Sequence, residues 1–176
     1  MRLPGTFLVA VLAFGCAAAQ AFEVSVPRYV EETASSGIEH SYTGEWEFMV
    51  GGGVATFDCD GDRMPDMLLS GGTSPAKFYR NTSAPGSALT FEAQASGLEL
   101  DMVSGAYPLD VDSDGATDIV LLRVGENVVM RGLGGCRFER ANERFGFDGG
   151  GARATALPPA FSPAAARRNP LTIRYP

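Results

Sequence analysis

Two aspartate-rich stretches repeat at a fixed interval and constrain the fold of this chain more than any other feature. The first is FDCDGDRMPD, residues 57–66, and the second is LDVDSDGATD, residues 109–118. When the chain is shifted by 52 residues, residues 53–70 overlie residues 105–122, and the leading glycine, all four aspartates and the apolar flanks coincide. Self-similarity at a period of this length predicts a repeat architecture.

The residues around each stretch predict strands and turns. Short apolar runs at 67–69 and 119–122 are typical of strands, and 77–80 and 127–131 are the next strands we expect. Residues 82–88 and 125–128 have the composition of loops and turns. No segment carries a helical stripe with caps. Several short strands in each repeat of about fifty residues predict an all-β fold built from β-propeller blades.

A second motif occurs three times and links the repeats. It consists of an aromatic residue followed by glutamate and, a few residues later, a glycine followed by an apolar residue. The three copies lie at 29–38, 91–98 and 138–147. Together with the aspartate-rich stretches they indicate two full units with an extra leading edge.

The spacing of the aspartates predicts a cage of oxygen atoms. Positions 1, 3, 5, 7 and 9 are occupied by Asp58, Asp60, Asp62, Met64 and Asp66 in the first loop, and by Asp110, Asp112, Asp114, Ala116 and Asp118 in the second. A tight loop turns the alternate carboxylates inward, and the residue at position 7 can add its backbone carbonyl. Calcium accepts six to eight such oxygens, so we expect Ca²⁺ as the bound ion. The alternative is an acidic hairpin in water that binds nothing.

These loops differ from an EF-hand and from each other. An EF-hand needs glutamate at position 12 and helices on both sides, whereas position 12 is Leu69 in one loop and Leu121 in the other. Position 6 favours a residue that tolerates positive φ. It is Gly115 in the second loop and Arg63 in the first. We expect Arg63 to add backbone strain and a nearby positive charge, and therefore to weaken the first site.

The N-terminus predicts the compartment in which the chain acts, and the net charge limits the classes of partner. Residues 1–21 have one arginine, an apolar run and a small-x-small cleavage site, which predicts an export signal cleaved near Ala21. A rival interpretation makes Cys16 a lipid-modified N-terminus. No later stretch is long and apolar enough to span a bilayer, so we do not expect an integral membrane protein after cleavage. A net charge of −7 argues against nucleic acid as a partner.

The cysteines predict a disulfide, and the scarcity of histidine argues against catalytic activity. Once the leader is removed, Cys59 and Cys136 remain, and in an oxidising compartment such a pair forms a disulfide more often than not. Two buried thiols are the alternative. His40 is the only histidine, and nothing else marks a catalytic pocket, so we expect no enzymatic activity. Residues 152–176 are rich in Pro, Ala and Arg and predict an irregular tail.

At the aspartate loops the chain resembles the FG-GAP or VCBS repeat, the calcium-binding blade of the integrin alpha-subunit propeller. Residues 37–72, followed by KFYRN at 77–81, are similar to the start of exported proteins related to cartilage acidic protein, the ASPIC/UnbV group. The resemblance implies a β-propeller with calcium in its loops and a role in binding or adhesion outside the cytoplasm, with a protein or a glycan as ligand.

The length of the repeat region sets the domain organisation that we expect. Residues 22–50 form the edge of a first blade, 51–100 the first repeat and 101–151 the second. A seven-bladed ring needs well over twice this length, so we expect an incomplete propeller. A shortened relic of a larger propeller and a non-catalytic part of a propeller enzyme are the alternatives.

Overall fold

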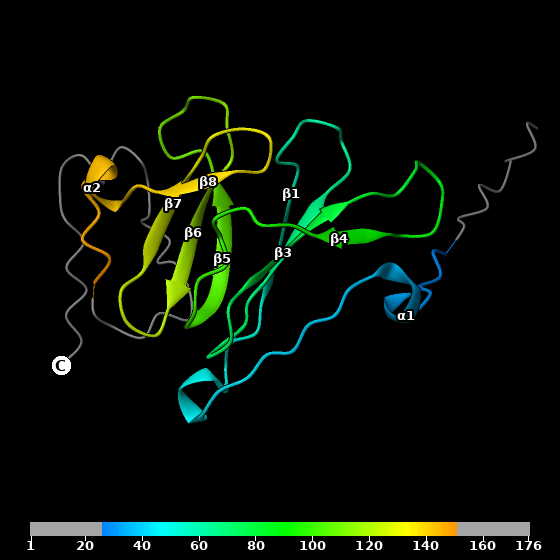
Figure 1. Ribbon diagram of the computed structural model, residues 1–176, viewed down its shortest axis with the longest axis horizontal. Helices are drawn as coiled ribbons and strands as arrows, with labels where there is room; N and C mark the ends of the chain where they lie inside the picture. The colour runs from blue at the N-terminus through cyan, green and yellow to red at the C-terminus, as the bar shows by residue number, and fades with distance from the viewer. Residues whose placement is uncertain (1–25, 151–176) are drawn as a thin grey trace, which may run out of the picture. The chain divides into compact units, whose positions relative to one another are not determined.

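The computed structural model describes residues 26–150, and they form an all-β structure (Figure 1). The chain divides into two units, Met1–Glu31 and Glu32–Pro176. In the first unit, residues 26–31 form no helix or strand and are exposed. The leader predicted at 1–21, with Cys16, and the tail predicted at 152–176 lie outside the described residues.

The second unit contains two four-stranded antiparallel sheets, in which each strand pairs with the next along the chain. The first sheet consists of β1 (Val54–Phe57), β2 (Asp66–Leu69), β3 (Lys77–Asn81) and β4 (Phe91–Ala93). The second consists of β5 (Val103–Leu109), β6 (Asp118–Arg123), β7 (Val128–Gly132) and β8 (Phe138–Arg140). The strands expected from the apolar runs are therefore confirmed, and the two repeats fold in the same strand order.

One face of the first sheet packs against the second sheet. Leu68 lies opposite Ala55 on one side and Phe78 on the other, and all three are buried. Because side chains alternate between the two faces of a strand, this row belongs to one face. It shares a hydrophobic core with Ile119 and Leu121 of β6.

The second sheet is buried on both faces. Ile119 and Leu121 point into the core shared with the first sheet, whereas Val120 and Leu122 belong to a second cluster with Val129. Phe145 and Phe147 pack on that second cluster. This double burial explains why residues 119–122 are apolar without alternation.

Three short helices accompany the sheets. They are α1 (Thr33–Ser36), the 3₁₀ helix η1 (Trp46–Phe48) and α2 (Asn142–Phe145). The sequence predicted no helix, and a segment of four residues is too short to develop an apolar stripe with a period of 3.6. Among residues 26–150, no helix has the length and apolar character that crossing a membrane requires.

The segment before β1 is fastened to the first sheet by polar contacts. The Tyr79 hydroxyl donates to the carbonyl of Glu39 at 2.5 Å and accepts from the N–H of Glu39 at 3.0 Å. The imidazole Nε2 of His40 lies 2.7 Å from the carbonyl oxygen of Ser70, just after β2. Residues 32–50 contain no strand, but Thr43 forms an isolated parallel bridge with Gly72, just after β2. That residues 22–50 form the edge of a first blade stays a prediction.

Candidate metal centre

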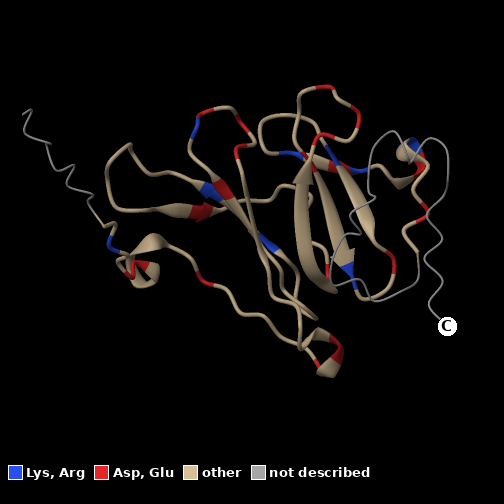
Figure 2. Cartoon of the chain, turned by 180° about the vertical axis from the view of Figure 1, so that it is seen from behind, with Lys and Arg blue, Asp and Glu red and all other residues tan. Residues whose placement is uncertain are grey.

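Both aspartate-rich loops join the first two strands of their sheets in the same register. The first loop connects β1 to β2, where Phe57 pairs with Asp66. The second connects β5 to β6, where Leu109 pairs with Asp118. In Figure 2 the acidic residues of both loops are coloured red, each at the connecting end of its sheet. The predicted strand-loop-strand arrangement is therefore present in both repeats.

The aspartate at position 1 organises the turn of each loop. Asp58 accepts backbone N–H bonds from Gly61 at 2.7 Å and from Arg63 at 2.8 Å. Asp110 accepts N–H bonds from Asp114 and Gly115, both at 3.1 Å, and of these the bond from Gly115 matches the one from Arg63. These bonds hold the loop in a coil around the first carboxylate, so the later carboxylates are brought together rather than spread along an extended chain.

Backbone donors also act on the charge of the loop carboxylates. Burial alone is the largest influence on the pKa of Asp58 and raises it, but the backbone N–H groups of Arg63, Gly61 and their neighbours together lower that pKa below its usual value. The N–H of Ala116 lowers the pKa of Asp114, and the guanidinium of Arg131 adds to this effect. Both carboxylates are thereby kept in the ionised form that a cation requires.

The aspartates at position 9 are buried at the first residue of β2 and β6. Asp66 is 1% exposed and Asp118 is fully buried. Asp118 accepts N–H bonds from Val111 at 2.9 Å and from Gly132 at 2.8 Å. Asp66 accepts the equivalent bonds from Cys59 at 3.1 Å and Asn81 at 3.0 Å. Each therefore ties its loop to the third strand of its sheet.

At position 9 burial outweighs the backbone donors, and the net shift of the pKa is upward. Burial raises the pKa of Asp66 and of Asp118 above the ordinary value, and the nearby carboxylates of the same loop raise it further, while the backbone N–H bonds lower it. A buried carboxylate surrounded by like charges is costly unless a positive charge lies close by.

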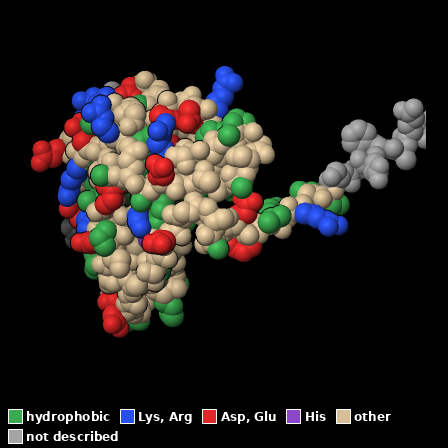
Figure 3. All heavy atoms as spheres, turned by 45° about the vertical axis from the view of Figure 1, so that its right-hand side comes forward, with side chains coloured by type: hydrophobic (Ala, Val, Ile, Leu, Met, Phe, Trp, Pro, Cys, Tyr) green, Lys and Arg blue, Asp and Glu red, His purple; other side chains and the backbone are tan. Residues whose placement is uncertain are grey.

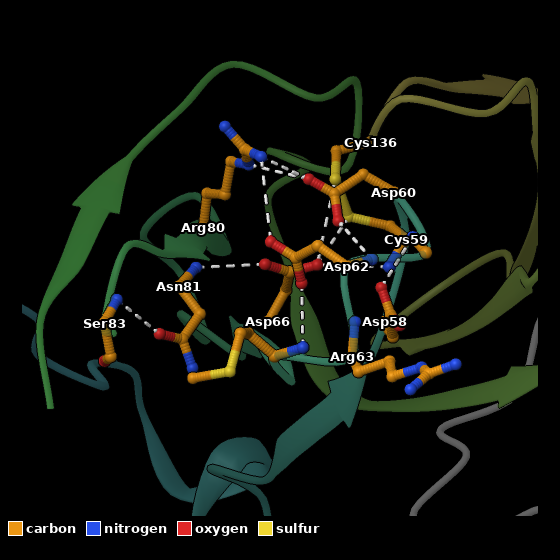
Figure 4. A network of polar contacts seen from close by, with 12 residues as sticks. Asp58, Cys59, Asp60, Asp62, Arg63, Asp66, Arg80, Asn81, Ser83 and Cys136 are labelled. Atoms are coloured by element: carbon orange, nitrogen blue, oxygen red, sulfur yellow. Dashed lines mark hydrogen bonds and ion pairs between the residues drawn. A yellow bond between two sulfur atoms is a disulfide. The ribbon is translucent and has the colours of Figure 1, made fainter. Parts of the chain in front are cut away.

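An arginine from the third strand of each sheet supplies positive charge to the loop, and Figure 4 shows the one in the first sheet, Arg80. Arg80 of β3 contacts Asp60, with its Nη2 2.5 Å from Oδ2, and its Nη2 lies 3.9 Å from Oδ2 of Asp62. Arg131 of β7 contacts Asp112 at 3.3 Å and Asp114 at 2.6 Å. Our sequence analysis missed this role, although both arginines fall at the same place when the repeats are aligned.

Arg63 does not provide the positive charge that we expected of it. Figure 4 shows its side chain directed away from Asp58, Asp60 and Asp62. Its backbone, however, has a φ of 69°, close to the 86° of Gly115 in the second loop. Position 6 therefore has the positive φ that we expected to be unfavourable for Arg63. Arg80, rather than Arg63, forms the ion pairs with the loop carboxylates, and the weaker binding of the first loop stays a prediction.

The structure brings three carboxylates together in each loop. One oxygen from each of Asp110, Asp112 and Asp118 lies within 4.8 Å of the other two, and the same holds for Asp58, Asp60 and Asp62. Asp66 belongs to a different group, with Cys59 and Cys136. The backbone N–H groups of Met64 and Ala116 donate to Asp62 and Asp114, and the carbonyls of these two residues stay predicted ligands.

One oxygen in the second group has its hydrogen-bonding capacity unused. Oδ1 of Asp112 is buried and has no hydrogen-bond partner within residues 26–150, whereas Oδ2 faces Arg131 and Arg144. A buried carboxylate oxygen without a partner is costly. An all-oxygen donor set with such an orphaned atom fits a hard cation such as Ca²⁺.

The group of Cys59, Asp66 and Cys136 is not a metal site. The two sulfur atoms are joined in a disulfide, with their Cα atoms 4.8 Å apart. Disulfide sulfurs have no thiolate to offer a metal. The pairing is the one that the sequence favoured over two buried thiols.

Charge outside the two loops is mixed in sign on the visible face. On the face that Figure 3 shows, acidic and basic side chains are interspersed, so the net negative charge is not gathered into one broad patch there. His40 contacts the carbonyl of Ser70 rather than a carboxylate or a nucleophile. Comparison of the chain with protein-family models, with curated proteins and with solved structures found no match.

Proposed function

We propose that this chain is an exported, non-enzymatic binding protein whose two aspartate loops each hold one calcium ion. The two sheets are blades of the β-propeller type, in an incomplete set. Calcium fixes the loops, and the surface that they support binds a protein or a glycan outside the cytoplasm. The resemblance to FG-GAP repeats, the predicted leader and the shared geometry of the two loops all support this proposal.

The observation that carries the calcium proposal is the orphaned Oδ1 of Asp112. Asp112 belongs to the group formed with Asp110 and Asp118, and its side chain is only 17% exposed. Water and protein donors satisfy most buried carboxylate oxygens. A cation coordinated by this atom would remove its desolvation cost and the repulsion among the three carboxylates together.

The arginines give the loops a way to tolerate the absence of calcium. Arg131 lies beside Asp112 and Asp114, and Arg80 lies beside Asp60. Both guanidinium groups are partly exposed, with side chains 24% and 44% accessible, so they can swing into water when a divalent cation takes their place. Calcium then replaces a screened surface ion pair with coordination inside the loop.

Isothermal titration of the full chain with calcium tests this function. We expect two binding events in the wild type and one in Asp112→Asn, because the amide keeps the shape of the side chain but loses the charge. Asp60→Asn should remove the other event. Asp101→Asn is the matched control, since Asp101 is exposed and lies outside both loops.

Two results would count against the proposal. One is the absence of any calcium-dependent heat in the wild type, in the presence of a folded circular dichroism spectrum. The other is a loss of binding in Asp101→Asn as large as that in Asp112→Asn, which would indicate screening of net charge rather than a site.

A further inference from the structure

The disulfide connects the acidic loop of the first sheet to the second sheet. Cys59 lies at position 2 of the first loop, between Asp58 and Asp60. Cys136 lies in the turn between β7 and β8. The link spans 77 residues of sequence. It is the one covalent connection between the two sheets other than the chain itself, among the residues that the structure describes.

Cys59 is also part of the scaffold of the first loop. Its N–H donates to Oδ2 of Asp66 at 3.1 Å, and its carbonyl accepts from the N–H of Cys136 at 3.4 Å. Its sulfur lies 2.8 Å from the same Oδ2. Because a disulfide sulfur carries no proton, this is a packing contact and not a hydrogen bond. The disulfide therefore fixes the backbone between two of the predicted calcium ligands.

The second loop provides an internal control, because it lacks the link. Val111 takes the place of Cys59 there, and its N–H donates to Asp118 as that of Cys59 donates to Asp66. The side chain of Val111 is buried in the second hydrophobic cluster, with Val120, Leu122 and Val129, and has no crosslink. The two loops thus share their hydrogen bonds and differ in the crosslink.

The turn that carries Cys136 is held in an unfavourable conformation. Gly134, Gly135 and Cys136 all have positive φ, at 74°, 58° and 58°. Glycine adopts this region freely, but a residue with a Cβ does so at a cost. Once the crosslink is released, the turn is free to leave this conformation, and the bond from Cys136 to the carbonyl of Cys59 would be lost with it.

The disulfide is open to a reductant through a groove between the two loops. The groove has a volume of about 410 Å³ and is lined by both cysteines, by Asp58 and Asp60 of the first loop, and by Asp114 and Gly115 of the second. Cys136 is 1% exposed, whereas Cys59 is only partly buried. An attacking thiolate therefore reaches the sulfur of Cys59 more readily.

We propose that the Cys59–Cys136 disulfide is a redox control on calcium binding by the first loop. A dithiol reductant, a protein or a small molecule, attacks the sulfur of Cys59, the S–S bond breaks and the sulfur of Cys136 leaves. The second thiol of the reductant then resolves the mixed disulfide. Two electrons and two protons pass to the chain, which ends with two thiols, while the dithiol becomes a disulfide. The first loop loses its crosslink and its calcium affinity falls.

Thermodynamic linkage makes this coupling reciprocal, and the inference rests on the proposed binding of calcium by the first loop. If reduction lowers calcium affinity about tenfold, saturating calcium makes the disulfide about tenfold harder to reduce. For a two-electron couple that factor corresponds to a shift of about 30 mV in reduction potential, toward more negative values. A disulfide that serves only to stabilise the fold would show no calcium dependence.

The test uses the full chain with Cys16→Ser, so that a single disulfide can form. Calorimetry measures the calcium affinity of the oxidised chain and of the chain reduced with dithiothreitol. The Asp112→Asn variant isolates the first loop, and the Asp60→Asn variant isolates the second. We expect reduction to weaken the first loop by about tenfold and to leave the second within about twofold. Cys59→Val, which copies the second loop, should reproduce the reduced affinity without any reductant.

The outcomes separate this inference from the function on which it rests. Absence of calcium binding to the oxidised Asp112→Asn chain overturns both. Binding that is the same before and after reduction, or a decrease of equal size in both loops, overturns only the redox control. A reduced chain that unfolds would lose both calcium sites together, and this result also counts against the redox control. The reduction potential of the disulfide, measured once with saturating calcium and once with a calcium chelator, gives an independent readout. A potential that is the same in both solutions contradicts the inference.

Discussion

Arg63 and Gly115 occupy the same position in the two loops and adopt the same left-handed backbone conformation, with φ of 69° and 86°. Glycine enters this region without steric cost, whereas a residue with a Cβ is strained there by roughly 1–2 kcal/mol. The conformation is imposed by the N–H bonds to the aspartate at position 1, since the donors include Arg63 and Gly115 themselves. At position 4 the order is reversed, because Ser113 of the second loop has a φ of 61° where the first loop has Gly61. Each loop therefore has one residue with a Cβ at positive φ, and the asymmetry that favours the second loop is confined to position 6.

Exchange of the two residues at position 6 tests the asymmetry. Arg63→Gly should strengthen calcium binding to the first loop by several-fold, because the loop that calcium orders then no longer holds a Cβ at positive φ, a strain of roughly 1–2 kcal/mol. Gly115→Arg should weaken the second loop by a similar factor. Calorimetry on each variant gives both affinities. Equal affinities for the first loop before and after Arg63→Gly would show that strain at position 6 does not limit binding.

At the scale of elements, two glycines of the threefold aromatic–glutamate motif let the chain pass close to the backbone of the last strand of a sheet. A Cβ at Gly37 would lie 2.5 Å from the carbonyl oxygen of Phe91 in β4, and a Cβ at Gly97 would lie 2.4 Å from that of Phe138 in β8. The apolar residue after the glycine then packs inward, and Leu98 is fully buried between the two sheets. At Gly146, the third copy, a Cβ would meet no atom within 4 Å in the described structure.

This difference predicts unequal effects of the same substitution. Gly97→Ala should lower the free energy of unfolding by more than about 2 kcal/mol, because the methyl group collides with backbone as well as opposing a positive φ. Gly146→Ala has only the conformational cost, about 1 kcal/mol. Urea denaturation of the two variants measures the difference. A Gly146→Ala variant as unstable as Gly97→Ala would indicate that something packs against the third glycine.

The sequence predicted the strands better than it predicted what surrounds the loops. Strands β2 and β6 were predicted because a short apolar run bounded by aspartate and glycine is too short for a buried helix and is typical of a buried strand. The helix α2 was missed because four residues carry no period. The roles of Arg80 and Arg131 depend on pairing between strands, which brings residues about 20 positions apart together. The orphaned oxygen of Asp112 likewise depends on burial that no local pattern reports.

For the molecule as a whole, the two sheets are held together by a shared apolar core and by the Cys59–Cys136 disulfide. The core contains residues of both repeats, so neither sheet buries its apolar face alone. Repeat units that stack in this way depend on their neighbours for stability. The crosslink acts mainly on the unfolded chain, where it closes a loop of 77 residues.

Removal of the disulfide should therefore destabilise the molecule without unfolding it. We expect Cys59→Ser with Cys136→Ser to lower the free energy of unfolding by about 4 kcal/mol in the chain-entropy treatment. Chemical denaturation with and without the link measures this, with Cys16→Ser as the control that leaves the disulfide intact. A loss below about 1 kcal/mol would mean that the unfolded chain is already compact enough to keep the two cysteines near each other.

The position of bound calcium is the central claim, and a crystal structure grown with calcium tests it most directly through anomalous scattering. We expect one peak in each loop, about 2.3–2.6 Å from carboxylate oxygens. In the second loop these include Oδ1 of Asp112, with Arg131 moved away. Loops without a peak at saturating calcium, with Arg80 and Arg131 still against Asp60 and Asp112, would contradict it.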